Sequence, residues 1–379
     1  MYLASDDRAA KPQQVVFGFL DEFVRRLEAK GGLTPPVRYG KTFTRVHDPL
    51  KWRMTADDLV RESGVQIIYH AVVTGVLSAD GEQIDGVRVW TKEGPLEVRA
   101  KITVDASGDA DLVAMAGFGD IIGRHGRVQN PTMIFRLGGV DVARFKSAYG
   151  DDTIMPAQVS NAINAAREAG ADLPRSKIWL FETTQPGELL CNCTRIVGDD
   201  GRELNALFRQ DFTEAEMNGR AQASAYSAFF RQSLEGCDKS YLIDTAPQVG
   251  IRQSRQLLGR YVLSNDDVVG GRKRDDGIAR SPWPIELHSG AKPRVEWILD
   301  DWYEVPFDCF VPKNGKNLLV AGRCLSAEHE AVASARVTAQ CFSYGEAIGH
   351  ATAIAAQLGV KPDEIDPHDI RARLPALAM

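Results

Sequence analysis

The hydrophobic pattern near the C-terminus predicts a buried strand, a polar loop and a long helix in succession. Residues 317–321 form a short apolar run that stops at Gly322, which is typical of a strand buried on both faces and followed by a tight turn. From about residue 336 to 357, apolar and small residues recur with helical spacing. Gly345 and Gly349 lie four positions apart on one side of this helix, so we expect a strand or a cofactor to approach it closely.

The loop that joins this strand to this helix is rich in polar side chains. They are Arg323, Ser326, Glu328, His329, Glu330, Ser334 and Arg336. In open α/β sheets, ligands bind beyond the carboxyl ends of the strands, where helix N-termini present unpaired N–H groups. The pattern therefore favours a ligand site in this loop. A small-residue helix packed on a sheet without any ligand is the alternative.

Upstream, apolar spacing predicts a series of elements that lead to a second buried strand. Helical spacing favours helices, whereas alternation on both sides of a Glu-Gly pair favours a β-hairpin. The expected elements are helices at about 15–29 and 55–63, a β-rich stretch at 65–78, and a hairpin formed by 84–91 and 96–100. The hairpin leads into an apolar strand at 102–106.

This second strand also ends at a polar turn, formed by Ser107, Gly108 and Asp109. Gly108 can adopt a positive φ or let a ligand approach the backbone, and Asp109 can cap a helix over 112–116. A strand–turn–helix corner without a ligand explains the same residues. Beside the loop after Gly322, the turn would form the second wall of one nucleotide cleft.

The middle of the chain is expected to be a β-rich region with one long helix. Residues 133–142 and 176–196 alternate apolar and polar positions as antiparallel strands do, and 212–233 has the pattern of a helix with a polar face. We interpret this part as a substrate-facing cap.

Arginines gather near the end of this region. Arg252 and Arg255 are three positions apart and share a face if the segment is helical, and Arg260 follows. Guanidinium groups match carboxylates, so this cluster could bind a carboxylate substrate. The alternative is a set of ion pairs with nearby aspartates, namely Asp266, Asp267, Asp275 or Asp276.

Composition restricts the function only mildly. The chain has 379 residues, 44% hydrophobic and 25% charged, which is ordinary for a globular protein of two interleaved units. A net charge of −6 argues against a nucleic-acid partner. No apolar run approaches the roughly 18 residues of a membrane span, and the polar N-terminus does not resemble a signal peptide. We therefore expect a cytoplasmic protein without a membrane partner.

Six cysteines were considered as ligands of an iron–sulfur cluster. Clusters need several thiolates at short spacings. Only Cys191 and Cys193 are close, and in a strand they would lie on one face. The scattered remainder is typical of buried free cysteine, so we predict no metal site.

Three stretches resemble the FAD-dependent oxidoreductase family, in the group that includes the heterodisulfide-reductase-A-like flavoproteins with a glutathione-reductase-type FAD fold. LLVAGRCLSAEHEA, continued by ARV and GEAIGHATAIA, is similar to the C-terminal FAD-binding segment of this family. AKITVDASGDADLVAMAG at 100–117 is similar to the strand, turn and short helix that meet the flavin nucleotide. PQVGIRQSRQLLGRYVLSNDDV at 247–268 resembles the segment before the last strand. The likeness covers about residues 15–374.

The chain departs from this family at its start. Members open with a βαβ unit whose G-x-G-x-x-G turn places the FAD pyrophosphate on a helix N-terminus. The first residues here contain neither an apolar strand nor that triplet, and Gly117, Gly119 and Gly123 have the wrong spacing. We expect a flavoprotein without its N-terminal unit: a truncated gene model, a fragment, or half of a site that a partner chain completes.

The resemblance implies an α/β fold with a discontinuous parallel-sheet FAD-binding domain and a mixed α+β, β-rich cap. The expected FAD-binding parts are residues 1–130, which include the hairpin, and 311–379. The expected cap is 131–310.

The resemblance also implies FAD as the cofactor and names residues for its site. The implied cofactor-binding residues are Val73, Ala106, Ser107, Gly108, Asp109, Gly322, Arg323, Ser326, Arg336 and Gly345. Gly322 and Arg323 would hold the ribityl–phosphate side, and the N-terminus of helix 336–356 would point at the flavin. His288 is similar to a position near the flavin in this family.

Three residues are candidates for catalysis. His288 and His329 titrate near neutral pH and could move a proton, although a lone histidine is more often structural. Arg255 could bind an anionic substrate. The resemblance implies FAD-dependent oxidoreduction of a small molecule, with hydride or electrons accepted at the flavin N5. The alternatives are a partner-dependent fragment without activity of its own and a nucleotide-binding module without redox chemistry.

Overall fold

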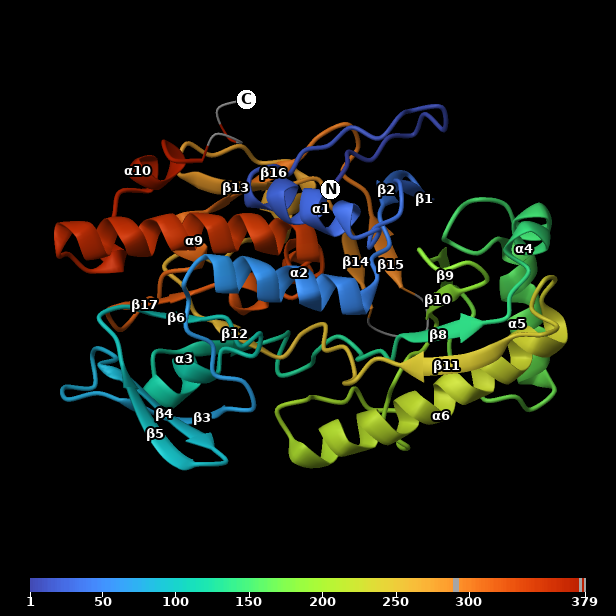
Figure 1. The fold of residues 1–379 in the computed structure, drawn as a ribbon, viewed down its shortest axis with the longest axis horizontal. Coiled ribbons are helices and arrows are strands. Elements are labelled where there is room, and N and C mark those ends of the chain that lie inside the picture. Colours follow the sequence, from blue (N-terminus) through green and yellow to red (C-terminus); the bar gives the residue numbers. More distant parts are fainter. Residues whose placement is uncertain (289–292, 375–376, 378–379) are drawn as a thin grey trace.

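The computed structural model describes residues 1–288, 293–374 and 377. Figure 1 shows that elements from the two ends of the chain, drawn in blue, cyan and red, gather on one side of the molecule. Elements from the middle of the chain, drawn in green and yellow, gather on the other side. The chain therefore passes from the first side to the second and returns.

The two predicted buried strands pair with each other. Strand β6 (Thr103–Asp105) runs parallel to β17 (Leu318–Val320), with Thr103 opposite Leu318 and Asp105 opposite Val320. Strand β17 is fully buried, which explains its unbroken apolar sequence. Within the described residues these two strands form a two-stranded sheet, which is smaller than the sheet expected from the sequence.

The predicted hairpin is confirmed as part of a three-stranded antiparallel sheet. Its strands are β3 (Val72–Leu77), β4 (Gly86–Thr91) and β5 (Gly94–Arg99). Gly94 has a φ of 108°, which the tight turn between β4 and β5 requires. The β-rich stretch expected at 65–78 was partly wrong, because residues 65–71 form no strand and only 72–77 pair with β4.

Helices α1 (Phe19–Ala29) and α2 (Pro49–Glu62) lie beside the long helix α9 (Thr338–Leu358), as Figure 1 shows. The ring of Phe342 on α9 is the meeting point, with centroids 4.8 Å from Phe23 and 5.7 Å from Trp52. Helix α2 begins six residues earlier than predicted because the Asp48 carboxylate caps it, accepting hydrogen bonds from the backbone N–H groups of Leu50 and Lys51.

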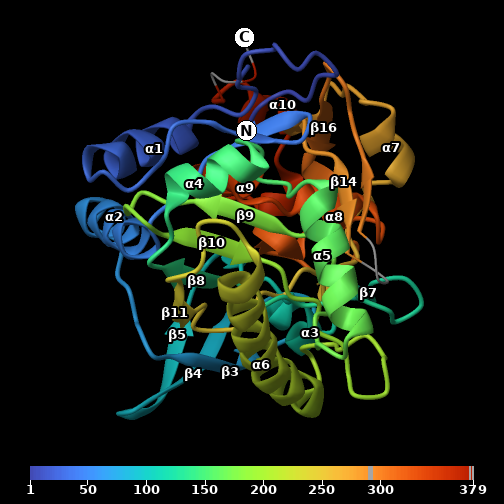
Figure 2. The same cartoon turned by 90° about the vertical axis from the view of Figure 1, so that its right-hand side faces the viewer.

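The middle of the chain forms an antiparallel sheet in the order β11–β8–β10–β9, and helices pack around it (Figure 2). Its strands are β8 (Phe135–Gly138), β9 (Trp179–Glu182), β10 (Leu189–Asn192) and β11 (Tyr241–Thr245), and its helices are α4 (Val142–Tyr149), α5 (Ala157–Glu168) and α6 (Arg209–Ser233). The alternating pattern and the long helix predicted for this region are confirmed.

The remaining elements are short. They are β1 (Val37–Tyr39), β2 (Thr42–Thr44), β7 (Asp120–Ile122), β12 (Arg255–Leu257), β13 (Gly277–Ser281), β14 (Ile285–Leu287), β15 (Arg294–Glu296) and β16 (Tyr303–Pro306), with helices α3 (Asp111–Ala116), α7 (Asn265–Val269), α8 (Ala331–Ala335) and α10 (Pro367–Arg371) and the 3-10 turns η1 (Phe307–Cys309), η2 (Gly322–Cys324) and η3 (Pro362–Glu364). The segment around Arg252 and Arg255 is not helical, since β12 pairs with β7, so these two arginines do not share a helical face.

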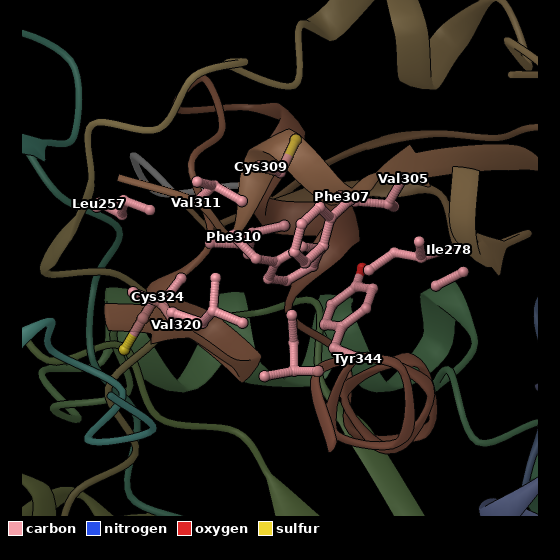
Figure 3. Packing of buried hydrophobic residues seen from close by; sticks show 14 of the residues in the cluster. Leu257, Ile278, Val305, Phe307, Cys309, Phe310, Val311, Val320, Cys324 and Tyr344 are labelled. Atoms are coloured by element: carbon pink, nitrogen blue, oxygen red, sulfur yellow. The ribbon is translucent and has the colours of Figure 1, made fainter. Parts of the chain in front are cut away.

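The largest hydrophobic core lies between β17, β16 and α9 (Figure 3). There the rings of Phe310 and Tyr344 meet with centroids 4.9 Å apart, beside Phe307 and Val320. A second hydrophobic core packs against the sheet of the middle region and includes Cys191 and Cys193. Among the described residues, no helix is long and apolar enough to cross a membrane.

Candidate functional site

The turn after β6 is organised by Asp105 rather than by Asp109. The buried Asp105 carboxylate accepts hydrogen bonds from the backbone N–H groups of Ser107 at 3.0 Å, Leu112 at 2.9 Å and Val113 at 3.2 Å. It therefore caps α3 from the preceding strand. The prediction that Asp109 caps this helix was wrong, because the positive φ of Gly108, 83°, turns Asp109 away toward the loop after β17.

Asp109 instead joins the two predicted walls of the cleft. Its carboxylate accepts a hydrogen bond from Arg323 at 2.9 Å and another from the Ser254 hydroxyl. A Cβ on Gly108 would lie 2.7 Å from the Arg323 guanidinium, so a larger residue would displace this side chain, and the φ of 83° itself favours glycine. We call Asp105, Ser107, Gly108, Asp109 and Arg323 the strand-end cluster.

Cys324 binds the same turn through its sulfur. Its Sγ lies 3.1 Å from the backbone nitrogen of Gly108 and 3.3 Å from that of Ala110, so both N–H groups point at it. Burial, followed by the charge of Asp105, raises the pKa of Cys324 to about 11. Cys324 is therefore a neutral thiol that fixes the turn.

Helix α9 leaves an open groove on its small-residue side. The groove measures about 830 Å³ and is lined by residues that include Cys341, Phe342, Gly345 and Gly349. A Cβ built on either glycine would meet no atom within 4 Å among the described residues. The close approach that the two glycines predict is therefore not made by any described part of this chain.

A second group of polar residues lies buried between the two sides of the molecule. It contains Tyr39, Arg175, Arg252, Glu286, His288 and Arg336, and we call it the arginine cluster. The Tyr39 hydroxyl donates to Glu286 Oε1 at 2.7 Å, and His288 Nε2 lies 3.4 Å from the same oxygen. Glu286 and His288 are two positions apart at β14, so strand geometry places both on one face.

The three arginines reach this group from different elements. Arg175 NH2 lies 3.2 Å from His288 Nδ1, and its guanidinium stands over the Trp179 ring at 5.6 Å. Arg252 donates to the backbone carbonyl of Asn130 at 3.0 Å. Arg336, at the junction of α8 and α9, donates to the Gln129 side chain at 3.3 Å.

These contacts fix the protonation of Glu286 and His288. Burial alone would raise the pKa of Glu286, but its contacts with His288 and Tyr39 outweigh burial and lower this pKa to about 2. Burial, followed by the charge of Arg252, lowers the pKa of His288 to about 3. A guanidinium can only donate, so His288 Nδ1 accepts from Arg175 and the ring proton is on Nε2. Glu286 is ionised and His288 is neutral.

The predicted catalytic residues are not brought together. Arg255 pairs with Asp111 at 2.7 Å, and Arg260 pairs with Asp363 at 2.8 Å, so neither meets the aspartates proposed as their ion-pair partners. The backbone carbonyl of His329 accepts from Gln129 at 3.4 Å, and burial lowers the pKa of its imidazole. His288 alone of the three lies in the arginine cluster.

The predicted cofactor residues fall into several places. Ala106 belongs to the turn after β6, and Gly322 opens the turn after β17 with a φ of 66° and open space at its Cβ position. Ser326 is buried, and its backbone N–H donates to the Cys309 carbonyl at 2.9 Å. Val73 lies on β3 opposite Val89. Arg336 is a member of the arginine cluster, where burial lowers its pKa to about 10 although the charge of Glu286 acts to raise it.

Three members of the arginine cluster were missed by sequence reasoning. Glu286 could have been found, since it precedes His288 by two positions in a strand. Arg175 and Tyr39 have no such local pattern. Among the described residues, no group of three or more His, Cys, Asp or Glu side chains could hold a metal ion.

Comparison with known proteins gives a family match over almost the whole chain. The profile of the family described as FAD dependent oxidoreductase matches residues 1–374. No curated protein sequence matches the chain.

Solved structures resemble the chain at low sequence identity. A geranylgeranyl bacteriochlorophyll reductase-like protein from Thermoplasma acidophilum is 13% identical, with 98% of this chain and 73% of that chain covered and a TM-score of 0.48. L-proline dehydrogenase from P. horikoshii is 12% identical, with coverages of 85% and 58% and a TM-score of 0.38. OxyS anhydrotetracycline hydroxylase from Streptomyces rimosus is 12% identical, with coverages of 94% and 54% and a TM-score of 0.40. The chain thus spans little more than half the length of the last two.

Proposed function

Because the chain belongs to the FAD dependent oxidoreductase family, we propose that the strand-end cluster and the loop after β17 hold FAD, and that the arginine cluster faces the substrate. Bound FAD supplies the acceptor or donor of hydride or electrons. The protein supplies position, polarity and exclusion of water. The chain is an FAD-dependent oxidoreductase, and the division of its residues between cofactor and substrate is our proposal.

One observation carries this division: Arg336 lies within electrostatic reach of both regions. Glu286 of the arginine cluster raises its pKa, and Arg323 of the strand-end cluster lowers it. A redox cofactor and its substrate must meet at one place, and Arg336 is the side chain that the two regions share. It follows Ala335 at the end of α8, directly before α9 begins.

The cofactor-binding residues of this proposal are those implied by the sequence. They are Val73, Ala106, Ser107, Gly108, Asp109, Gly322, Arg323, Ser326, Arg336 and Gly345. The open Cβ positions at Gly322 and Gly345 support close approach of a large group there. The guanidinium of Arg323 is held in place by Asp109 and can offer its remaining donors to a phosphate.

For catalysis we propose His288, His329 and Arg255, with unequal support. His288 is a neutral imidazole whose two ring nitrogens are engaged by Arg175 and Glu286, so it would act by positioning Arg175 rather than by bonding to the substrate. His329 follows the loop after β17 and is also kept neutral by burial. Arg255 is already paired with Asp111, so it would have to exchange that partner for an anionic substrate.

We also propose the corresponding domain limits. The FAD-binding domain would comprise residues 1–130 and 311–379, and the cap 131–310. Residues 289–292 of the cap and 375, 376, 378 and 379 of the C-terminal part lie outside the described residues.

The alternative proposal is that another polypeptide segment completes the FAD site. Within the described residues β6 pairs on one edge only, and Val104 at its centre is 38% exposed. An unpaired strand edge offers N–H and C=O groups to a further strand. The open groove along α9 would receive the same segment, supplied in the same chain or by a partner.

Visible absorbance of the purified chain after addition of excess FAD and desalting tests the function. We expect retained flavin bands, and we expect Arg323→Met and Arg336→Met to lower FAD affinity by at least tenfold. The matched control is Arg231→Met, at an exposed position in the last turn of α6. If the folded chain keeps no flavin, its residues alone do not form a complete FAD site. That result would favour the alternative, in which another polypeptide segment completes the site. Unchanged affinity in Arg323→Met would remove Arg323 from the site.

A further inference from the structure

The arginine cluster contains more buried positive charge than its own carboxylate neutralises. Arg175 is 1% exposed and Arg252 is 6% exposed, and Arg336 lies beside them. Three guanidinium groups share one ionised carboxylate, that of Glu286, while His288 is neutral. The cluster therefore carries two positive charges in excess. Buried charges are normally paired, because an uncompensated ion is costly in a low-dielectric interior.

Several hydrogen-bond donors of the cluster also lack partners. Among the described residues, Arg175 Nε and NH1 and Arg336 Nε are buried without an acceptor. Trp179 stacks against Arg175, and its indole nitrogen is also buried without a hydrogen-bond partner. Both side-chain polar atoms of Asn130 are likewise buried without partners. Buried donors of native proteins are almost always satisfied, so several in one place indicate a missing acceptor.

An anion would supply both the charge and the acceptor. Guanidinium groups donate strongly to carboxylate oxygens, and Arg175 has Nε and NH1, on different edges of its guanidinium, without acceptors among the described groups. Burial, then the like charges of Arg175 and Arg336, lowers the pKa of Arg252, and an anion placed among the three arginines would relieve this repulsion.

The surroundings of the cluster favour an organic anion over an inorganic one. Aromatic rings form its wall: Tyr39 lies 6.5 Å from Trp179 in a stacked arrangement and 5.3 Å from Trp283. A cavity of about 260 Å³ is lined by Trp283 and Val337 but by no member of the arginine cluster. Apolar walls with a few convergent polar groups are typical of sites for small organic ligands.

We propose that Arg175 and Arg252, assisted by Arg336, bind the carboxylate of an ionised organic acid, and that this acid is the substrate class of the enzyme. The proposal rests on the proposed function, because it places the acid next to the residue that the two regions share. His288 positions Arg175 through its Nδ1, and Glu286 holds His288 through the Nε2 proton. Removing Glu286 would therefore disturb the site without removing a ligand contact.

Calorimetric titration of the full chain, with and without FAD, tests the proposal. The probes are acetate, succinate, benzoate and inorganic phosphate, and the fluorescence of Trp179 and its neighbours gives a second readout independent of catalysis. We expect an organic carboxylate to bind and to raise the melting temperature. We expect Arg175→Met and Arg252→Met to weaken this binding at least tenfold, while Arg231→Met leaves the dissociation constant unchanged.

A site residue and a structural residue differ in the ligand-free protein. If Arg175 is present for an anion, Arg175→Met keeps or raises the melting temperature of the free chain while binding is lost. If it is structural, the same substitution lowers the melting temperature and leaves any binding intact. Arg175→Lys retains the charge and loses the fork, so it keeps the fold and weakens binding at least threefold. This variant decides the question if Arg175→Met does not fold.

The outcomes separate this inference from the proposed function. If the chain binds a carboxylate but retains no FAD, the acid site is supported. Only the proposal that this chain alone forms a complete FAD site is then rejected. Retained FAD with no binding of any carboxylate probe, or phosphate binding as tight as carboxylate binding, overturns the acid site alone. Binding that is equal in wild type and in both Met variants also overturns it.

Discussion

The strand-end cluster and the arginine cluster are both polar and partly or fully buried, yet their charges are balanced differently. The strand-end cluster is balanced in the sense that each of its charges has partners: Arg323 pairs with Asp109, and the Asp105 carboxylate is satisfied by three backbone N–H groups. In the arginine cluster, three arginines share Glu286. A balanced group can be complete by itself, whereas an unbalanced buried group requires a ligand to be complete. This difference separates a cluster whose charges are satisfied within the described residues from one that, as we propose, receives an anion.

The difference gives the clusters opposite responses to removal of charge. In the balanced cluster, loss of either partner of an ion pair should destabilise the protein slightly and similarly. In the arginine cluster, loss of the carboxylate should be severe, whereas loss of an arginine should be tolerated. Each of the following experiments tests one part of this contrast, in order of decreasing effect.

Glu286→Gln should give the largest effect. The substitution keeps the shape of the side chain but leaves three buried guanidiniums without an anion, so we expect a loss of about 3–5 kcal/mol in the free energy of unfolding. Urea denaturation measures it. Addition of a bound carboxylate probe should recover part of the loss. A loss below about 1 kcal/mol would show that the excess positive charge is screened. The arginine cluster would then not differ from the strand-end cluster in its charge balance.

Asp105→Ala should follow. Its carboxylate satisfies three backbone N–H groups at the start of α3, and their loss of an acceptor should cost about 2–3 kcal/mol. Asp105→Asn is the control, because its remaining oxygen can still accept from Leu112 or Val113. In urea denaturation, the free energy of unfolding of Asp105→Asn should lie between those of Asp105→Ala and wild type. Equal losses for the two variants would mean that charge, rather than capping, is what Asp105 supplies.

The sequence predicts the strand-end cluster better than it predicts the arginine cluster, for a physical reason. The turn after β6 and the loop after β17 each follow directly from a buried strand, so local pattern locates Gly108 and Gly322. Even there the cap was assigned to Asp109 instead of Asp105, because the path of the backbone at Gly108 decides which carboxylate faces α3. Local pattern places the turn but does not orient its side chains.

The arginine cluster is assembled from distant segments, which no local pattern can show. Tyr39 comes from β1, Arg175 from the connection between α5 and β9, and Arg336 from the start of α9. Each is ordinary in its own stretch of sequence, and only tertiary packing makes it buried. His288 was found by resemblance, and Arg252 was found as one of a group of charges, whose shared face depended on a helix that does not form.

The pH dependence of stability should report His288. Its pKa is about 3 when folded and 6.5 in the unfolded chain, so below pH 6.5 the unfolded state binds a proton that the folded state does not. Stability should therefore be complete above pH 6.5 and fall with decreasing pH, by up to about 1.4 kcal/mol per pH unit from this residue. His288→Gln should reduce the slope of the melting temperature between pH 6.5 and 5, and the remaining slope should come from His47 and His329, whose pKa values burial also lowers.

The interval is chosen because Glu286, whose folded pKa is about 2, contributes stability that is lost only at lower pH, below its unfolded value of 4.5. His350→Gln on α9, outside the arginine cluster, is the matched control. An equal slope in wild type and His288→Gln would mean that His288 is not held neutral, and would weaken the assigned tautomer.

The Arg323–Asp109 pair should show the smallest effect and the most symmetrical one. Both side chains retain some solvent exposure, and such ion pairs contribute about 0.2–1 kcal/mol. Arg323→Met and Asp109→Asn should therefore each lower stability by no more than about 1 kcal/mol, and a double-mutant cycle should return a coupling of the same size. Glu286→Gln and Arg252→Met should instead differ in sign or by severalfold. If the two pairs of variants behave alike, the excess charge of the arginine cluster is not what distinguishes it, and the case for a bound anion falls with it.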